Sequence, residues 1–149
     1  MSVGTYRYGE RSGLNGLCIG VTRYPPRGVS PDSAAARACY DVWLPLLAPS
    51  KELIRVYKRG TLSFSRFAAK YRREMQRPDP RHVIETLAAV AQHQRVHFGC
   101  YCADETLCHR SLLQTLIAEA QISPDPAPDD HQTRSRYSSP ACAMPEIED

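Results

Sequence analysis

The sequence predicts a single α/β domain in which helices flank a small, mainly parallel sheet. Residues 17–21 form a short apolar run typical of a buried strand, and residues 95–100 have the alternating character of a second strand. Amphipathic helical patterns lie between these segments and after the second one. This order of strand, helices, strand and helix is typical of a sheet with helices packed on it, and 149 residues suffice for about one such domain.

The composition divides the chain into three segments. Residues 1–15 are polar and contain glycine, which predicts a flexible N-terminal arm, and residues 16–122 form the α/β domain. Residues 123–149 hold five of the twelve prolines and few apolar residues, so we expect a disordered, Pro-rich acidic tail. The sequence contains neither the ~18 consecutive apolar residues of a membrane span nor the apolar core of a signal peptide. We therefore expect a cytoplasmic protein that does not associate with membranes.

The first predicted strand, residues 17–21, is followed by a loop that carries Arg23 and Arg27. The chain must turn here because the adjacent Pro25 and Pro26 continue neither a central strand nor a helix. Residues 39–44 are aromatic and β-branched, which predicts either a second strand or an apolar segment docked on the core.

The middle of the chain predicts three helices. Ser50 is the expected N-cap of a short helix that ends near Gly60. A helix over residues 64–76 follows, with a buried face made of apolar side chains at helical spacing: Phe64, Phe67, Ala68, Tyr71 and Met75. The third helix covers about residues 80–94, after an aspartate N-cap and a proline at its first position. A last helix, at about residues 108–121, follows the second strand.

Positive charge is concentrated in one segment. Lys51–Arg77 contains nine basic and two acidic residues, a net charge of +7, whereas residues 123–149 have a net charge of −4. On the helix over residues 64–76, Arg66, Lys70 and Arg73 fall opposite the buried face and form an outward row. Such a face suits a phosphate-rich partner, although a solvated helical face is the plainer interpretation.

Three of the six cysteines lie within nine residues, in a loop between the second strand and the last helix. Ligands of open α/β sheets bind at this edge, and a helix N-terminus there favours an anion. Helix dipole and nearby cations also lower the pKa of a thiol, so we expect Cys108 to be activated, with His109 as a base and Arg110 as an anion ligand. If the two strands are neighbours, Arg23 and Arg27 converge on the same site.

Two other interpretations of the cysteines stay open. Zinc could be held by a Cys₃His set comprising Cys100, Cys102, Cys108 and His109, although short paired spacings are commoner in zinc sites. Alternatively, the thiols are inert packing residues, because free cysteine is among the most buried residue types. We assign no metal and leave the cofactor unknown.

Four motifs in order resemble the family called domain of unknown function 488, over about residues 17–120. They are Arg23-Tyr24-Pro25-Pro26-Arg27-Gly28-Val29, the segment from Asp41 to Ser50 with Glu52-Leu53, the segment from Phe67 to Glu74, and Cys108-His109-Arg110. The first two are most similar to its YeaO-like branch. The resemblance implies a compact α/β domain of bacterial origin without a settled reaction. It also adds Asp41 and Ser50 to Arg23 and Arg27 as candidate ligand-binding residues.

Three functions follow from these observations. The first is an enzyme or binding domain that holds a phosphate-bearing small molecule, or uses a thiol, between the Arg23/Arg27 loop and the Cys102–Arg110 loop. The alternative is a nucleic-acid-binding module that uses the basic Lys51–Arg77 face, and the second alternative is a zinc-stabilised structural protein.

Overall fold

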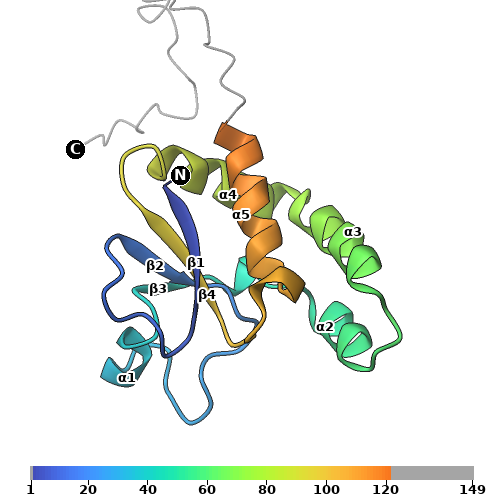
Figure 1. Ribbon diagram of the computed structural model, residues 1–149, viewed down its shortest axis with the longest axis horizontal. Coiled ribbons are helices and arrows are strands. Elements are labelled where there is room, and N and C mark those ends of the chain that lie inside the picture. Colours follow the sequence, from blue (N-terminus) through green and yellow to red (C-terminus); the bar gives the residue numbers. More distant parts are fainter. Residues whose placement is uncertain (1, 122–149) are drawn as a thin grey trace, which may run out of the picture.

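A computed structural model describes residues 2–121 and contains one four-stranded parallel sheet (Figure 1). The strand order is β1-β4-β2-β3, with these bounds: β1 Val3–Arg7, β4 Val96–Cys100, β2 Leu17–Gly20 and β3 Val42–Trp43. The predicted α/β class is therefore confirmed. The predicted tail, residues 123–149, lies outside the described residues.

In the described part of the chain, five α-helices accompany the sheet: α1 Ala34–Arg37, α2 Lys51–Lys58, α3 Phe64–Met75, α4 Pro78–Val90 and α5 His109–Gln121. Helix α5 contacts β1, β4, α3 and α4, so it lies at the centre of the helical side. Figure 1 shows α2 and α3 beyond α5, on its far side from the sheet. Two 3₁₀ turns, Pro45–Leu47 and Glu105–Leu107, precede α2 and α5. No helix within residues 2–121 has the length and apolar character needed to cross a membrane.

Local signals set the ends of α2 and α3 as expected, whereas α4 begins at Pro78 after Arg77, so Asp79 lies in its first turn and is not its N-cap. The hydroxyls of Ser50 and Ser63 accept hydrogen bonds from Leu53 N and Arg66 N, which caps α2 and α3. Gly60 adopts φ +73°, a left-handed conformation that glycine allows without strain, and it turns the chain from α2 toward α3. Helix α4 ends at Val90, four residues earlier than predicted.

Residues 1–15 are not simply an arm, because β1 lies within them. Val3–Arg7 pairs in parallel with all five residues of β4, and Val3 and Tyr6 point into buried surroundings. The prediction missed this strand because it contains few apolar residues, and β4 supplies its hydrogen bonds from about 90 positions away. The sequence also did not predict the short helix α1.

Tyrosine rings cover part of the sheet, and two glycines make room for them. A Cβ on Gly99 would lie 2.3 Å from Cζ of Tyr6, and a Cβ on Gly20 would lie 2.3 Å from the hydroxyl of Tyr8 and 2.6 Å from the ring of Tyr40. The rings of Tyr8 and Tyr40 are 5.8 Å apart, an ordinary aromatic contact. Glycine at the ends of β2 and β4 thus lets aromatic rings lie directly on the backbone.

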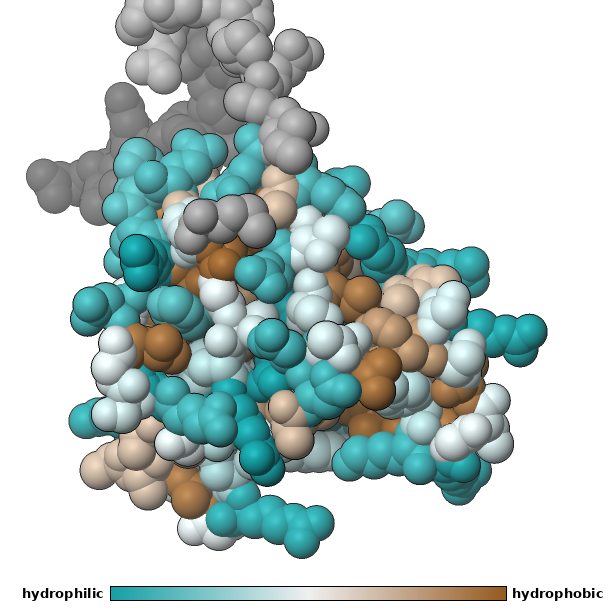
Figure 2. Space-filling view, viewed as in Figure 1, coloured by the Kyte–Doolittle hydropathy of each residue, from teal (hydrophilic) through white to brown (hydrophobic). Residues whose placement is uncertain are grey.

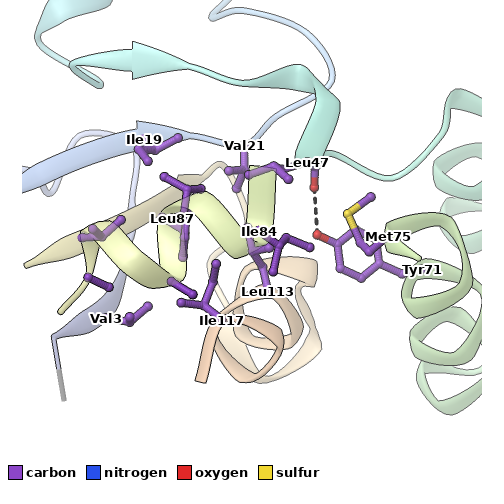
Figure 3. Close-up of a cluster of buried hydrophobic side chains, with 14 of the residues drawn as sticks. Val3, Ile19, Val21, Leu47, Tyr71, Met75, Ile84, Leu87, Leu113 and Ile117 are labelled. Atoms are coloured by element: carbon purple, nitrogen blue, oxygen red, sulfur yellow. Dashed lines mark hydrogen bonds between the residues drawn. The ribbon is translucent and has the colours of Figure 1, made fainter. Parts of the chain in front are cut away.

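The apolar core lies between the sheet and helices α3, α4 and α5 (Figure 3). Side chains from β2, β4, α4 and α5 fill it, among them Ile19, Phe98, Ile84 and Leu113. Tyr71 of α3 is fully buried, and its hydroxyl donates a hydrogen bond of 2.8 Å to the carbonyl of Leu47. This bond ties the outer helix α3 to the 3₁₀ turn that precedes α2.

We predict that Tyr71→Phe lowers the free energy of unfolding by about 1–2 kcal/mol, because the buried carbonyl of Leu47 loses its hydrogen bond. Urea denaturation of the full-length protein measures the change. Tyr57→Phe is the matched control, because the Tyr57 hydroxyl makes only an exposed contact of 3.4 Å to Leu107 O. Equal destabilisation by the two substitutions would contradict the prediction.

Candidate functional site

The loops after β2 and β4 meet at the carboxyl edge of the sheet, as parallel neighbouring strands require. Together with one face of α2 they line a pocket of about 640 Å³. The imidazole of His109, at the start of α5, makes a 2.7 Å hydrogen bond to the carbonyl of Val21, just after β2. The arginine loop and the cysteine loop therefore lie together, and Arg23, Arg27 and the three cysteines all line this pocket.

Three thiols gather at the pocket wall. The sulfurs of Cys100, Cys102 and Cys108 all lie within 4.8 Å of one another, and Cys100 Sγ donates to Cys102 Sγ over 3.8 Å. Cys100, the last residue of β4, and Cys108, just before α5, are buried, whereas Cys102 is exposed. Two buried sulfurs thus lie beside one sulfur that solvent and ligands reach.

The three thiols differ in pKa because they share hydrogen bonds. Donation from Cys100, and then from Cys108, lowers the pKa of Cys102 well below its usual range, and the charge of Arg110 adds to this effect. The same hydrogen bonds, together with burial, raise the pKa of Cys108 and of Cys100. Of the three sulfurs, the exposed one of Cys102 is therefore the one at which the thiolate is most favoured.

His109 is buried, and burial lowers its pKa to about 4, so it is neutral at pH 7. Its Nε2 faces a carbonyl oxygen, which only accepts, so Nε2 bears the hydrogen and donates to Val21 O. The lone pair is consequently on Nδ1, 3.7 Å from Cys108 Sγ. His109 joins the two loops and lines the pocket, with its Nδ1 beside the buried thiol of Cys108.

Arg110 is also buried, and its Nη1 donates a 2.6 Å hydrogen bond to the carbonyl of Tyr6 in β1. Its Nε has no hydrogen-bond partner among residues 2–121. A buried guanidinium without a carboxylate raises the local positive potential, which agrees with its effect on the pKa of Cys102.

The other candidate ligand-binding residues have different surroundings. Arg23 donates to the carbonyls of Ala48 and Pro49 over 2.9–3.1 Å, so its guanidinium holds the chain before α2 in place. Arg27 lines the pocket. Asp41 accepts from Cys18 N and pairs with Arg11, near the start of β2. Ser50 caps α2 and lines a second cavity between α2 and α3.

Sequence reasoning did not assign the remaining pocket walls. Aromatic and aliphatic side chains form much of them, and one lysine joins Arg27; these residues are Tyr24, Tyr57, Lys58, Tyr101 and Leu107. Their positions offered a partial signal, since Tyr24 and Tyr101 adjoin the arginine and cysteine motifs. The sequence placed Tyr57 and Lys58 only within the basic segment Lys51–Arg77. Which face of α2 points toward the pocket depends on contacts with residues far away in the sequence, so their place in the pocket could not be predicted.

The thiol cluster suits a soft metal ion in part. Zinc–sulfur bonds of ~2.3 Å in a tetrahedral site place sulfurs about 3.8 Å apart, close to the Cys100–Cys102 separation. However, within the described part of the chain the group with mutual distances under 4.8 Å contains only the three cysteines. The Cys₃His set is thus not assembled with His109. Zinc stays a prediction, which elemental analysis of the full-length protein tests.

The comparisons with known proteins identify the family. Residues 3–121 match a family model described as "Active DUF488-N3 subclade", and the chain belongs to the DUF488 family. No curated protein and no solved structure matches the chain. The description names the N3 subclade, and the resemblance to the YeaO-like branch stays a prediction.

We predict that Cys100→Ala shifts the pH profile of Cys102 alkylation upward by about one pH unit or more, because the thiolate loses its strongest hydrogen-bond donor. Cys100→Ser keeps an O–H donor and is expected to shift the profile less. Peptide-resolved mass spectrometry after timed iodoacetamide treatment at pH 5–9 measures it. Cys18→Ala, which removes a buried thiol from β2, is the control, and a shift as large as that of Cys100→Ala would contradict the assignment.

We predict that His109 makes the protein less stable as the pH falls from about 6.5 toward 4. Its pKa is lower in the folded state than the ordinary value of about 6.5, so the unfolded chain binds the extra proton in this window and is stabilised relative to the folded protein. The loss is about 1.4 kcal/mol per pH unit at most. Urea denaturation at pH 7 and pH 5 is expected to show a smaller difference for His109→Gln than for the wild type. His93→Gln, at an exposed position, should keep the full difference.

Proposed function

We propose that this protein is a cysteine-dependent enzyme for a small phosphate-bearing substrate, with Cys102 as its nucleophile. The observation that supports it most is the position of Cys102, an exposed residue that lines the pocket, accepts a hydrogen bond from the buried Cys100 thiol and has its sulfur within 4.8 Å of that of Cys108. A thiolate is the reactive form of cysteine, and its stabilisation at neutral pH is what nucleophilic catalysis requires. The description of the matched family model as active agrees with a catalytic role.

The charge of the pocket supports an anionic substrate. Arg27 and Lys58 line it, and neither forms an ion pair with a carboxylate within residues 2–121. The buried Arg110 adds positive potential behind the thiols. A phosphate group bound by Arg27 and Lys58 would bring the substrate against Cys102. Arg23 serves to shape the pocket, since its donors already bind two carbonyls.

The walls of the pocket support a substrate with an apolar or aromatic body. Tyr24, Tyr57, Tyr101 and Leu107 line it, and a volume of about 640 Å³ lies in the range of small-molecule sites. The apolar part would pack on these rings while the acid group meets the cations. Binding energy from the body then holds the reacting atom near the sulfur.

The cluster supplies the elements of a two-step reaction. The Cys102 thiolate attacks an electrophilic atom of the substrate, and the leaving group departs with a proton from solvent water. A second reactant then displaces the sulfur and restores the thiolate, while its proton passes to water. His109 is a positioning residue, because its hydrogen bond to Val21 O holds the cysteine loop against the arginine loop.

Alkylation with a charged and a neutral reagent tests this function. We expect the ratio of the iodoacetate rate to the iodoacetamide rate to be higher at Cys102 than at Cys39, which lies outside the pocket lining. Arg27→Ala and Lys58→Ala should each lower the ratio at Cys102 by about threefold, because they weaken the local positive field. Phenyl phosphate should protect Cys102 in the wild type and less in these variants.

Arg81→Ala is the control, because Arg81 pairs with Glu85 on α4. The proposal of an anionic substrate would be overturned if the ratio of the iodoacetate rate to the iodoacetamide rate were equal at Cys102 and Cys39 and unchanged by Arg27→Ala and Lys58→Ala. Faster labelling of Cys100 than of Cys102 in the wild type would overturn Cys102 as the nucleophile.

A further inference from the structure

A row of exposed cations follows one side of α3, away from the thiol pocket. Arg66, Lys70, Arg73 and Arg77 are spaced four, three and four residues apart, which places them on one face of the helix and its immediate end. At a rise of 1.5 Å per residue the row is about 16 Å long. Figure 2 shows hydrophilic side chains projecting from the edge of the molecule where α2 and α3 lie.

These four cations are not neutralised by the described part of the protein. The ion pairs found between residues 2–121 involve Arg11, Arg55, Arg72 and Arg81, and none of the four. The contrast with Arg72 is instructive, because Arg72 points from α3 toward Glu119 of α5 and pairs with it. The helix thus neutralises an arginine on its inner side and leaves the outer row free.

The row is held on a rigid support. The opposite face of α3 contains Phe67, Tyr71 and Met75, all buried in the core, and Tyr71 is also tied to Leu47 O. The helix cannot rotate without exposing these side chains. A ligand that binds the row therefore does not bear the cost of ordering the helix.

A cavity of about 680 Å³ adjoins the row between α2 and α3. Lys70, Arg73 and Arg77 line it, and Leu53 and Val56 of α2 give it an apolar side. Two carboxylates also line it: that of Glu52 pairs with Arg55 on α2, and that of Glu74 accepts the backbone N–H of Ser50. The cavity combines positive charge with apolar surface, as a sugar-phosphate unit requires.

We propose that the outer face of α2 and α3 binds single-stranded nucleic acid, whose phosphates lie along the row from Arg66 to Arg77. A row of about 16 Å matches repeated negative charge along a chain rather than one small anion. The apolar side of the cavity, formed by Leu53 and Val56, gives an unpaired base a surface on which to pack beside the phosphates. The polymer is assigned as single-stranded for that reason.

Fluorescence anisotropy with a labelled 12-nucleotide single strand of mixed sequence, and its duplex form, tests the proposal on the full-length protein. We expect binding at 50 mM salt that weakens with a log–log slope of about −3, because four phosphate contacts contribute about −0.7 each. Arg73→Gln/Arg77→Gln should reduce the slope to about −1.5 and weaken binding at least tenfold. Arg81→Gln/Arg95→Gln removes the same charge from other exposed positions and should change binding less than twofold.

Each outcome decides the matter. No binding at 50 mM salt, or equal loss of binding in the two double variants, would overturn the proposal. Tighter binding of the duplex would overturn the single-stranded assignment. Cys102→Ser should bind the single strand like the wild type, so failure of the nucleic-acid surface and failure of the thiol chemistry are measured separately.

Discussion

The hydrogen bond from His109 to the carbonyl of Val21 is the contact on which the candidate site depends. It joins the loop after β2 to the loop after β4, whose strands pair directly in the sheet. The pairing brings the two strand ends to one edge, and the imidazole sets the approach of the loops that leave them. Because burial keeps this imidazole neutral, it can occupy the space between the loops without a counterion.

As a result, the three cysteine sulfurs at this edge differ in exposure and in pKa. Burial alone raises the pKa of a thiol, so a lone buried cysteine at this edge would be inert. Here the buried Cys100 thiol donates to Cys102, the pKa values of both buried thiols are raised, and the thiolate is favoured at the sulfur that solvent and ligand can reach. The buried Arg110 stabilises this arrangement from behind while holding β1 through the carbonyl of Tyr6.

Much of the architecture could be predicted from the sequence, because it depends on local patterns. The strands at residues 17–20 and 96–100, the serine caps of α2 and α3, and the glycine turn after α2 follow from short motifs. The convergence of the arginine and cysteine loops followed from parallel pairing, which was an inference from element order. Strand β1 was missed because it contains few apolar residues, and its pairing with β4, about 90 residues later, leaves no local pattern in the sequence.

Other features of the site could not be predicted, because they too depend on contacts between residues far apart in the sequence. The acceptors of Arg23 are the carbonyls of Ala48 and Pro49, and no sequence pattern specifies a distant carbonyl. Prediction placed the reactive thiol at Cys108, next to the helix start, whereas the exposed sulfur is that of Cys102. Exposure depends on the path of the loop after β4, which the spacing of the cysteines does not determine.

The pairing of β1 with β4 has a consequence for synthesis on the ribosome. The first strand to emerge can acquire its only sheet neighbour among the described residues once β4 has been translated, about 90 residues later. The residues that flank the thiols, His109 and Arg110, emerge later still. A nascent chain that ends soon after Cys102 therefore has the Cys100 donor but lacks Arg110 and the link from His109 to Val21, so the site around Cys102 is assembled only when the domain is almost complete.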